Sequence, residues 1–101
     1  MSKNQDILPS LEAVVAEKLT ASAFESVRIR ERKMVVQMEE LGIDILDVYY
    51  VLKHHEAINC LSQFDRRYKV AGKSIDNVQL VVMIIVTDEG ELSKIVNVRA
   101  T

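Results

Sequence analysis

The residues best suited to acid–base chemistry stand together as His54-His55-Glu56. An imidazole titrates near neutral pH and binds zinc, so this pair could serve a catalytic step or hold a metal ion. Adjacent residues diverge by about 100 degrees on a helix and face opposite sides of a strand, so both imidazoles rarely reach one ion. We therefore predict no metal and no other cofactor, and keep His54 and His55 as candidate acid–base residues. The alternative is that they end a helix, where the dipole stabilises positive charge.

A second group of candidates is cationic. Arg67, Lys69 and Lys73 surround or follow Tyr68 in a stretch with a period of two, and Arg99 joins them if the last strand lies beside the central one. Cationic groups can hold a phosphodiester, while a phenol ring can stack on a base or donate a proton. These residues predict an RNA-binding patch. The alternative is a solvated strand whose lysines and arginines prevent edge-to-edge aggregation.

Composition limits the class of protein. The chain has 101 residues, of which 49% are hydrophobic and 28% charged, and this predicts one soluble globular domain in which residues 1–8 are disordered. No apolar run approaches the about 20 residues of a membrane helix, and the start lacks an apolar export segment. With a lone cysteine, Cys60, we expect a cytoplasmic protein. The net charge of −2 creates no global field that attracts RNA.

The segment 78–86 is the most apolar of the chain and must position much of the rest. Its length and composition predict a central strand. Val81, Met83 and Ile85 lie on one face with Gln79, and the other face carries Val78, Leu80, Val82, Ile84 and Val86. Helices can cover one face. We expect the second face to meet a further helix, a partner subunit or a ligand.

Helical periodicity appears in the first half of the chain. It predicts helices over 10–20, over 24–41 with a frayed start, and over 45–53. Gly42 and Ile43 predict a Schellman cap at the end of the second helix, and Asp44 predicts the N-cap of the third.

The second half alternates instead. It predicts strands over 58–64, 66–73, 78–86 and 92–99, with the first at an edge and with turns at Asp76-Asn77 and at Asp88-Glu89-Gly90. Helices grouped before strands indicate an α+β fold, in which about three helices pack on one side of a four-stranded antiparallel sheet.

The order Glu40-Leu41-Gly42-Ile43, a short helix, then Arg67-Tyr68-Lys69-Val70-Ala71-Gly72-Lys73 resembles a family of small uncharacterised bacterial domains, over residues 31–99. Those domains are similar to RelE-type and MqsR-type toxins, metal-independent ribonucleases whose helices pack on a small antiparallel sheet. The family's helix motif is His-Ala-x-x-Arg-Met-x-x-Arg-Gly-Ile, and its histidine and arginines correspond to Lys33, Gln37 and Leu41 here. The resemblance implies a RelE-like fold and, as partners, RNA and a small antitoxin protein.

In a ribonuclease of this class, a base deprotonates the ribose 2′-hydroxyl, cations stabilise the phosphate and an acid protonates the departing oxygen. If this mechanism holds here, residue type and assumed proximity assign phosphate binding to Arg67, Lys69 and Arg99 and an acid–base role to His54 or His55. Tyr68 would then stack on a base or donate a proton. The alternative function is a noncatalytic protein-interaction module that keeps the fold without the activity. Its interface would be Val81, Met83 and Ile85, paired with another protein or with a second copy in a homodimer.

Overall fold

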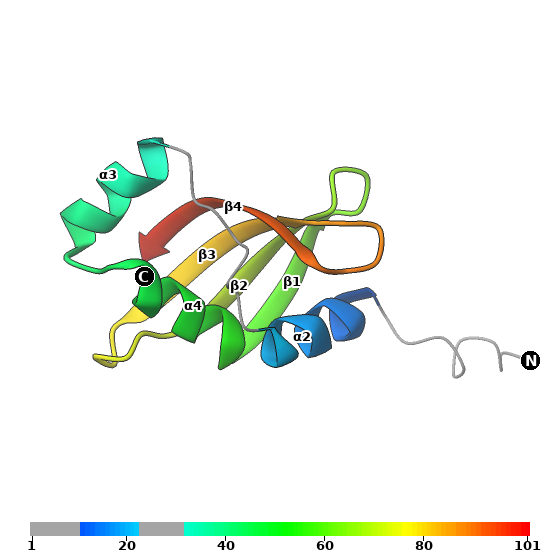
Figure 1. Ribbon diagram of the computed structural model, residues 1–101, viewed down its shortest axis with the longest axis horizontal. Helices are drawn as coiled ribbons and strands as arrows, with labels where there is room; N and C mark the ends of the chain where they lie inside the picture. The colour runs from blue at the N-terminus through cyan, green and yellow to red at the C-terminus, as the bar shows by residue number, and fades with distance from the viewer. Residues whose placement is uncertain (1–10, 23–31) are drawn as a thin grey trace, which may run out of the picture.

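The computed structural model describes residues 11–22 and 32–101, and these form helices followed by one sheet (Figure 1). The helices are α2 (Leu11–Ala21), α3 (Arg32–Leu41) and α4 (Ile45–Lys53). The strands are β1 (Ala57–Ser62), β2 (Arg67–Lys73), β3 (Gln79–Val86) and β4 (Leu92–Ala100). The α+β arrangement is confirmed. The expected disorder of residues 1–8, the helix start at residue 10 and the helical part of 24–31 lie outside the described residues.

Local sequence signals set the ends of α3 and α4. Gly42 has a φ of +71°, and the amides of Gly42 and Ile43 donate to the carbonyls of Glu39 and Met38, which is the predicted Schellman cap. Asp44 then caps α4 through its Oδ1, which accepts from the amides of Leu46 at 2.9 Å and Asp47 at 3.2 Å. The bounds of α4 match the prediction because the chain leaves one cap directly into the next.

The strands form an antiparallel meander in the order β1-β2-β3-β4 (Figure 1). The predicted edge position of the first strand and central position of the third are confirmed. Asn77, with a φ of +68°, and Gly90, with a φ of +87°, supply the left-handed residues in the two later turns. Bulges shift the β3–β4 register after Met83 and after Ile85.

The first strand ends earlier than expected. The alternation of the sequence predicted a strand that reaches Phe64, but Phe64 lies in a turn and is 92% exposed. The Ser62 hydroxyl oxygen accepts from the Asp65 amide at 3.1 Å, which closes this turn, and Arg66 takes a positive φ of 55°. A local serine turn therefore wins over the alternation of the sequence.

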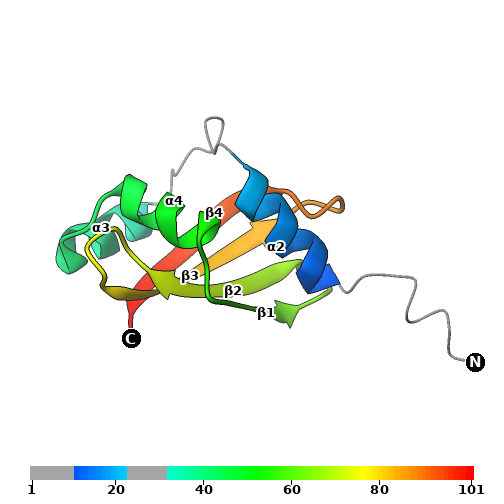
Figure 2. The same cartoon turned by 90° about the horizontal axis from the view of Figure 1, so that it is seen from below.

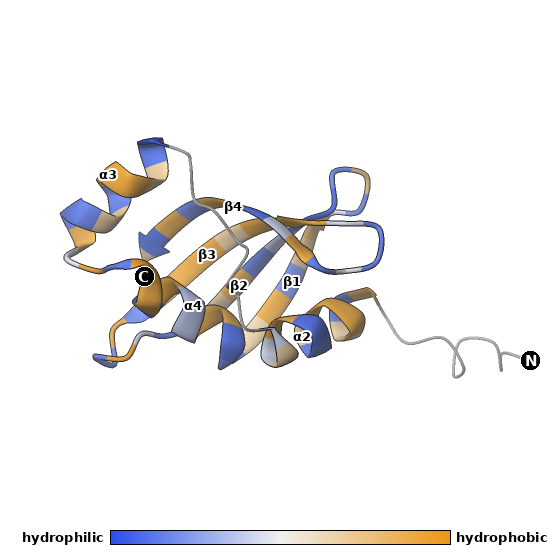
Figure 3. Cartoon of the chain, in the orientation of Figure 1, coloured by the Kyte–Doolittle hydropathy of each residue, from blue (hydrophilic) through white to orange (hydrophobic). Residues whose placement is uncertain are grey.

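The described helices lie on one side of the sheet (Figure 2). Helix α4 packs on β2 and β3, α2 reaches from β1 to the β3–β4 hairpin, and α3 packs along β4. Burial along β3 alternates strictly: Leu80, Val82, Ile84 and Val86 are buried under the helices, and the residues between them are half-buried. Figure 3 shows the same strand as a continuous apolar band between more polar neighbours.

Both edges of the sheet bond to a helix side chain. On β1, the Cys60 amide donates to Glu12 Oε2 of α2 at 2.6 Å. On β4, the Val98 amide donates to Gln37 Oε1 of α3 at 3.1 Å. These bonds are long-range in sequence, and they fix the two outer helices to the two outer strands.

Candidate interaction face of the sheet

The face of the sheet that points away from the helices carries most of the residues that the sequence singled out. We call it the open face. It consists of alternate residues of neighbouring strands in cross-strand register: Ala57 and Asn59 of β1; Arg67, Lys69, Ala71 and Lys73 of β2; Gln79, Val81, Met83 and Ile85 of β3; Lys94, Asn97 and Arg99 of β4. None of the described elements covers it (Figure 2).

The charged residues of the four strands all have one sign. The four strands contain no aspartate or glutamate and five lysines or arginines, although the whole chain carries −2. Every one of the five pairs across a strand with an open-face residue of β3. One carboxylate reaches the rim of this face, because Gln79 Nε2 donates to Oε1 of Glu56, the residue before β1, at 3.3 Å. The strands themselves make the rest of the open face a local basic surface on an acidic protein.

The centre of the open face is an apolar stripe of Val81, Met83 and Ile85, each of which is half-buried. On one side Lys69 pairs with Met83, and on the other side Arg99 pairs with Val81. Long cationic side chains can shield apolar neighbours with their methylene stems while their charged ends stay in water. The stripe therefore has a basic border on both sides.

Two buried polar atoms on this face have no hydrogen-bond partner among the described residues. They are Nε of Arg67, a donor, and Oδ1 of Asn97, an acceptor. Within residues 11–22 and 32–101, no carboxylate lies within ion-pair distance of Arg67, Lys69 or Arg99. By contrast, Arg66, one residue before β2, pairs with Asp88 at 2.5 Å. Within the described residues, the charges of Arg67, Lys69 and Arg99 are therefore not neutralised by an ion pair.

The histidines lie on the other side of the sheet. His54 is the C-cap of α4, and its ring centroid is 4.6 Å from that of Tyr50. His55 Nδ1 donates to the Leu52 carbonyl at 2.9 Å, and the His55 backbone packs over Gly72 of β2. His54 also lines a pocket of about 320 Å³ between α4 and the β2–β3 turn. The sheet stands between these imidazoles and the cations of the open face.

Tyr68 is fully buried on the helix side of β2, with an exposed fraction of 0%. Burial, with smaller contributions from the Cys60 thiol and the Glu12 carboxylate, raises the pKa of Tyr68 to about 12. Its hydroxyl oxygen has no hydrogen-bond partner among the described residues. The phenol therefore faces away from Arg67 and Lys69, out of reach of a base stacked on the open face.

We expect Tyr68→Phe to raise the free energy of unfolding by about 1 kcal/mol at neutral pH, because it removes a buried hydroxyl that makes no hydrogen bond. In the wild-type chain, the pKa of this phenol is about 12 in the folded state and near 10 in the unfolded state. Its titration therefore does not change the free energy of unfolding below pH 10, and lowers it as the pH rises from 10 toward 12. Urea unfolding at about pH 7 and pH 11 measures both effects. The variant should lose less stability between these pH values than wild type; an equal loss would contradict this assignment.

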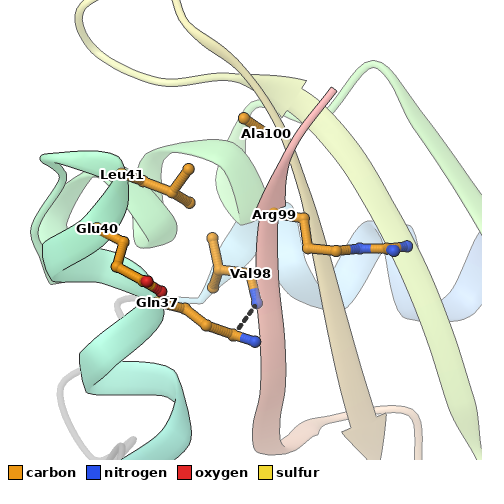
Figure 4. A pocket seen from close by; sticks show the side chains of 6 residues that line it. All are labelled: Gln37, Glu40, Leu41, Val98, Arg99 and Ala100. Atoms are coloured by element: carbon orange, nitrogen blue, oxygen red, sulfur yellow. Dashed lines mark hydrogen bonds between the residues drawn. The ribbon is translucent and has the colours of Figure 1, made fainter.

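A second pocket, of about 260 Å³, lies between α3 and the C-terminal end of β4 (Figure 4). The Gln37 side chain lies in this pocket, and its Oε1 accepts a hydrogen bond from the Val98 amide. The Arg99 side chain points away from Gln37 and across the sheet. Together with the pairing of Arg99 with Val81, this geometry places the Arg99 guanidinium on the open face, although Arg99 also lines the pocket.

The structure brings together the predicted cations and the predicted interface residues, and it separates both from His54, His55 and Tyr68. Sequence reasoning missed Lys94 and Asn97 as members of the open face. Their faces could not be read from the alternation, because the bulge after Met83 changes the phase of β4.

Within the described part of the chain, no three histidine, cysteine or carboxylate side chains are placed to share a metal ion. Among those same residues, no helix has the length and hydropathy needed to span a membrane. The chain matched no family model, no curated protein and no solved structure.

Proposed function

We propose that this protein is a noncatalytic interaction module that binds another protein through the open face of its sheet. The observation that carries the proposal is the apolar stripe Val81, Met83 and Ile85 with cations on both sides, on a face that no described element covers. Such a face combines hydrophobic burial with charge selection, and this is the usual composition of a protein-docking surface.

The arrangement of the candidate catalytic residues supports binding over cleavage. A ribonuclease step needs an acid–base group within hydrogen-bond reach of the same phosphate that the cations hold. His55 bonds to its own helix, and Tyr68 is buried on the opposite face from Lys69. A RelE-like scaffold of this kind would keep the fold of the toxin ribonucleases without their chemistry.

Among the partners that the resemblance implies, the open face favours a protein over RNA. Proteins that bind single-stranded RNA on a sheet stack bases on exposed aromatic rings, and the four strands carry one aromatic residue, the buried Tyr68. A second copy is also disfavoured, because face-to-face pairing would oppose five cations with five. An antitoxin-like protein with acidic groups meets both conditions.

Site-specific photo-cross-linking in cells tests this function. A photoreactive residue in place of Met83 should give one protein adduct, and the same residue in place of Leu46 should not. Leu46 is the matched control because it is 60% exposed but lies on α4, on the covered side of the sheet. Charge reversal at Arg99 should reduce the Met83 adduct without reducing the amount of folded chain.

The alternatives give distinct results. A nuclease-sensitive adduct would replace this function with RNA binding, and an adduct of twice the chain mass would replace it with self-association. Purified protein should also leave RNA intact without divalent metal. Cleavage that is lost in Arg67→Ala and Arg99→Ala would establish the ribonuclease instead.

A further inference from the structure

We infer that the open face binds an amphipathic α-helix with an apolar stripe and carboxylates on both flanks, lying along β3. This inference rests on the proposed function and specifies its partner. It follows from the width of the face, its length and the sign of the charges along its borders.

The width of the face fits a helix. The cations of β2 and β4 are separated by β3 alone, so their backbones lie two strand spacings apart, about 10 Å. An α-helix with its side chains is about 10–12 Å across. A helix seated on Met83 would therefore direct its flanking residues at Lys69 on one side and Arg99 on the other. A single extended strand is narrower and could meet only one border at a time.

The length of the stripe sets a minimum size for the partner. Val81, Met83 and Ile85 are two residues apart, and each step spans about 6.7 Å along a strand. Residues four apart on a helix are separated by about 6 Å, so apolar side chains at i, i+4 and i+8 match the three positions. About 10 residues of helix cover the stripe.

The charges select the flanks of that helix. Lys69, Lys73 and Arg67 border the stripe along β2, and Arg99 borders it along β4. Glutamates on both flanks would pair with these cations.

Three synthetic peptides of 14 residues test the inference. The first carries leucine at i, i+4 and i+8 with glutamate on both flanks, the second has lysine in place of each glutamate, and the third keeps the glutamates but scatters the leucines. We expect the glutamate-flanked peptide alone to bind in fluorescence anisotropy, to gain helical circular dichroism on binding and to weaken as salt rises.

Variants of the protein locate the site. Met83→Glu should lower the affinity for the glutamate-flanked peptide at least tenfold, because it places a charge of the same sign as the glutamates in the centre of the stripe. The double variant K69E and R99E should no longer bind this peptide and should bind the lysine-flanked one, because it reverses the charge on both borders of the stripe. Lys53→Glu is the matched control, because it reverses an exposed cation of α4 on the covered side and should leave binding unchanged. Circular dichroism of each variant confirms that it is folded.

The outcomes separate this inference from the function on which it rests. Equal binding of the glutamate- and lysine-flanked peptides, or no helix gain, would overturn the acidic helix. If a protein adduct still forms at Met83, the interaction module stands and only its partner class is wrong. A single-stranded RNA 12-mer that binds more tightly than the peptide, with the same loss in K69E and R99E, would overturn both.

Discussion

Ile84→Ala should lower the free energy of unfolding by about 3–4 kcal/mol and the melting temperature by about 15 °C or more. Ile84 is fully buried in the middle of β3, and its side chain belongs to the core that α2, α4 and the sheet enclose. The substitution removes buried methylene and methyl groups and leaves a cavity that the surrounding strands fill poorly. A loss of this size is a large part of the total stability of a small domain.

Ile85→Ala provides the matched control on the adjacent residue. It makes the same chemical change on the same strand, so any loss of β-propensity is shared by the two variants. Ile85 lies on the open face and is half-buried, and the expected cost is about 1 kcal/mol. Urea unfolding of both variants measures the difference. Equal costs would mean that the open face is as closely packed as the core, and would remove the stripe as a binding surface.

Gly72→Val should lower the free energy of unfolding by about 3 kcal/mol. A Cβ at Gly72 would lie 3.2 Å from the Cα of His55 and 3.5 Å from both Cγ1 and the carbonyl oxygen of Val51. Two of these atoms belong to the backbone at the end of α4, so the helix must move away from β2 to admit a side chain. The higher β-propensity of valine, at most about 1 kcal/mol, is too small to offset this.

Ala71→Val is the control for that substitution. Ala71 precedes Gly72 on β2 but faces the open side, where it pairs with Val81. The described helices lie on the opposite side of the sheet (Figure 2). The added methyl groups should leave stability unchanged or raise it slightly. Measured in urea with an unchanged m-value, a gap of less than about 1 kcal/mol between the two variants would contradict the close approach of α4 to β2.

The sequence was most informative where short-range chemistry decides the structure. Gly42 and Asp44 predicted the end of one helix and the start of the next, and both caps are present. The alternation of β3 predicted its two faces because the side-chain period of a strand holds without any knowledge of its neighbours. The same rule placed Tyr68 opposite Arg67 and Lys69, and the burial of Tyr68 follows from it.

What the sequence could not predict depends on contacts between distant elements. Glu12 contacts β1 from 48 residues away, and Gln37 contacts β4 from 61 residues away, with no local pattern to mark either side chain. The separation of His54 from the open face follows from the side of the sheet on which α4 packs. A helix stripe shows that a face is buried, and the topology alone determines on which side of the sheet it is buried.

The side chains that bond to the outer strands also restrict how other molecules can approach. An incoming strand that paired with β1 at Cys60 or with β4 at Val98 would have to displace the side chain of Glu12 or Gln37, each of which comes from a helix packed on that strand. Pairing of another strand with either edge of the sheet, as in donor-strand exchange or cross-β stacking, is therefore disfavoured by the loss of one of these hydrogen bonds. A partner would therefore bind more readily to the open face than to either edge strand. On that face it would contact side chains instead of backbone amides and carbonyls.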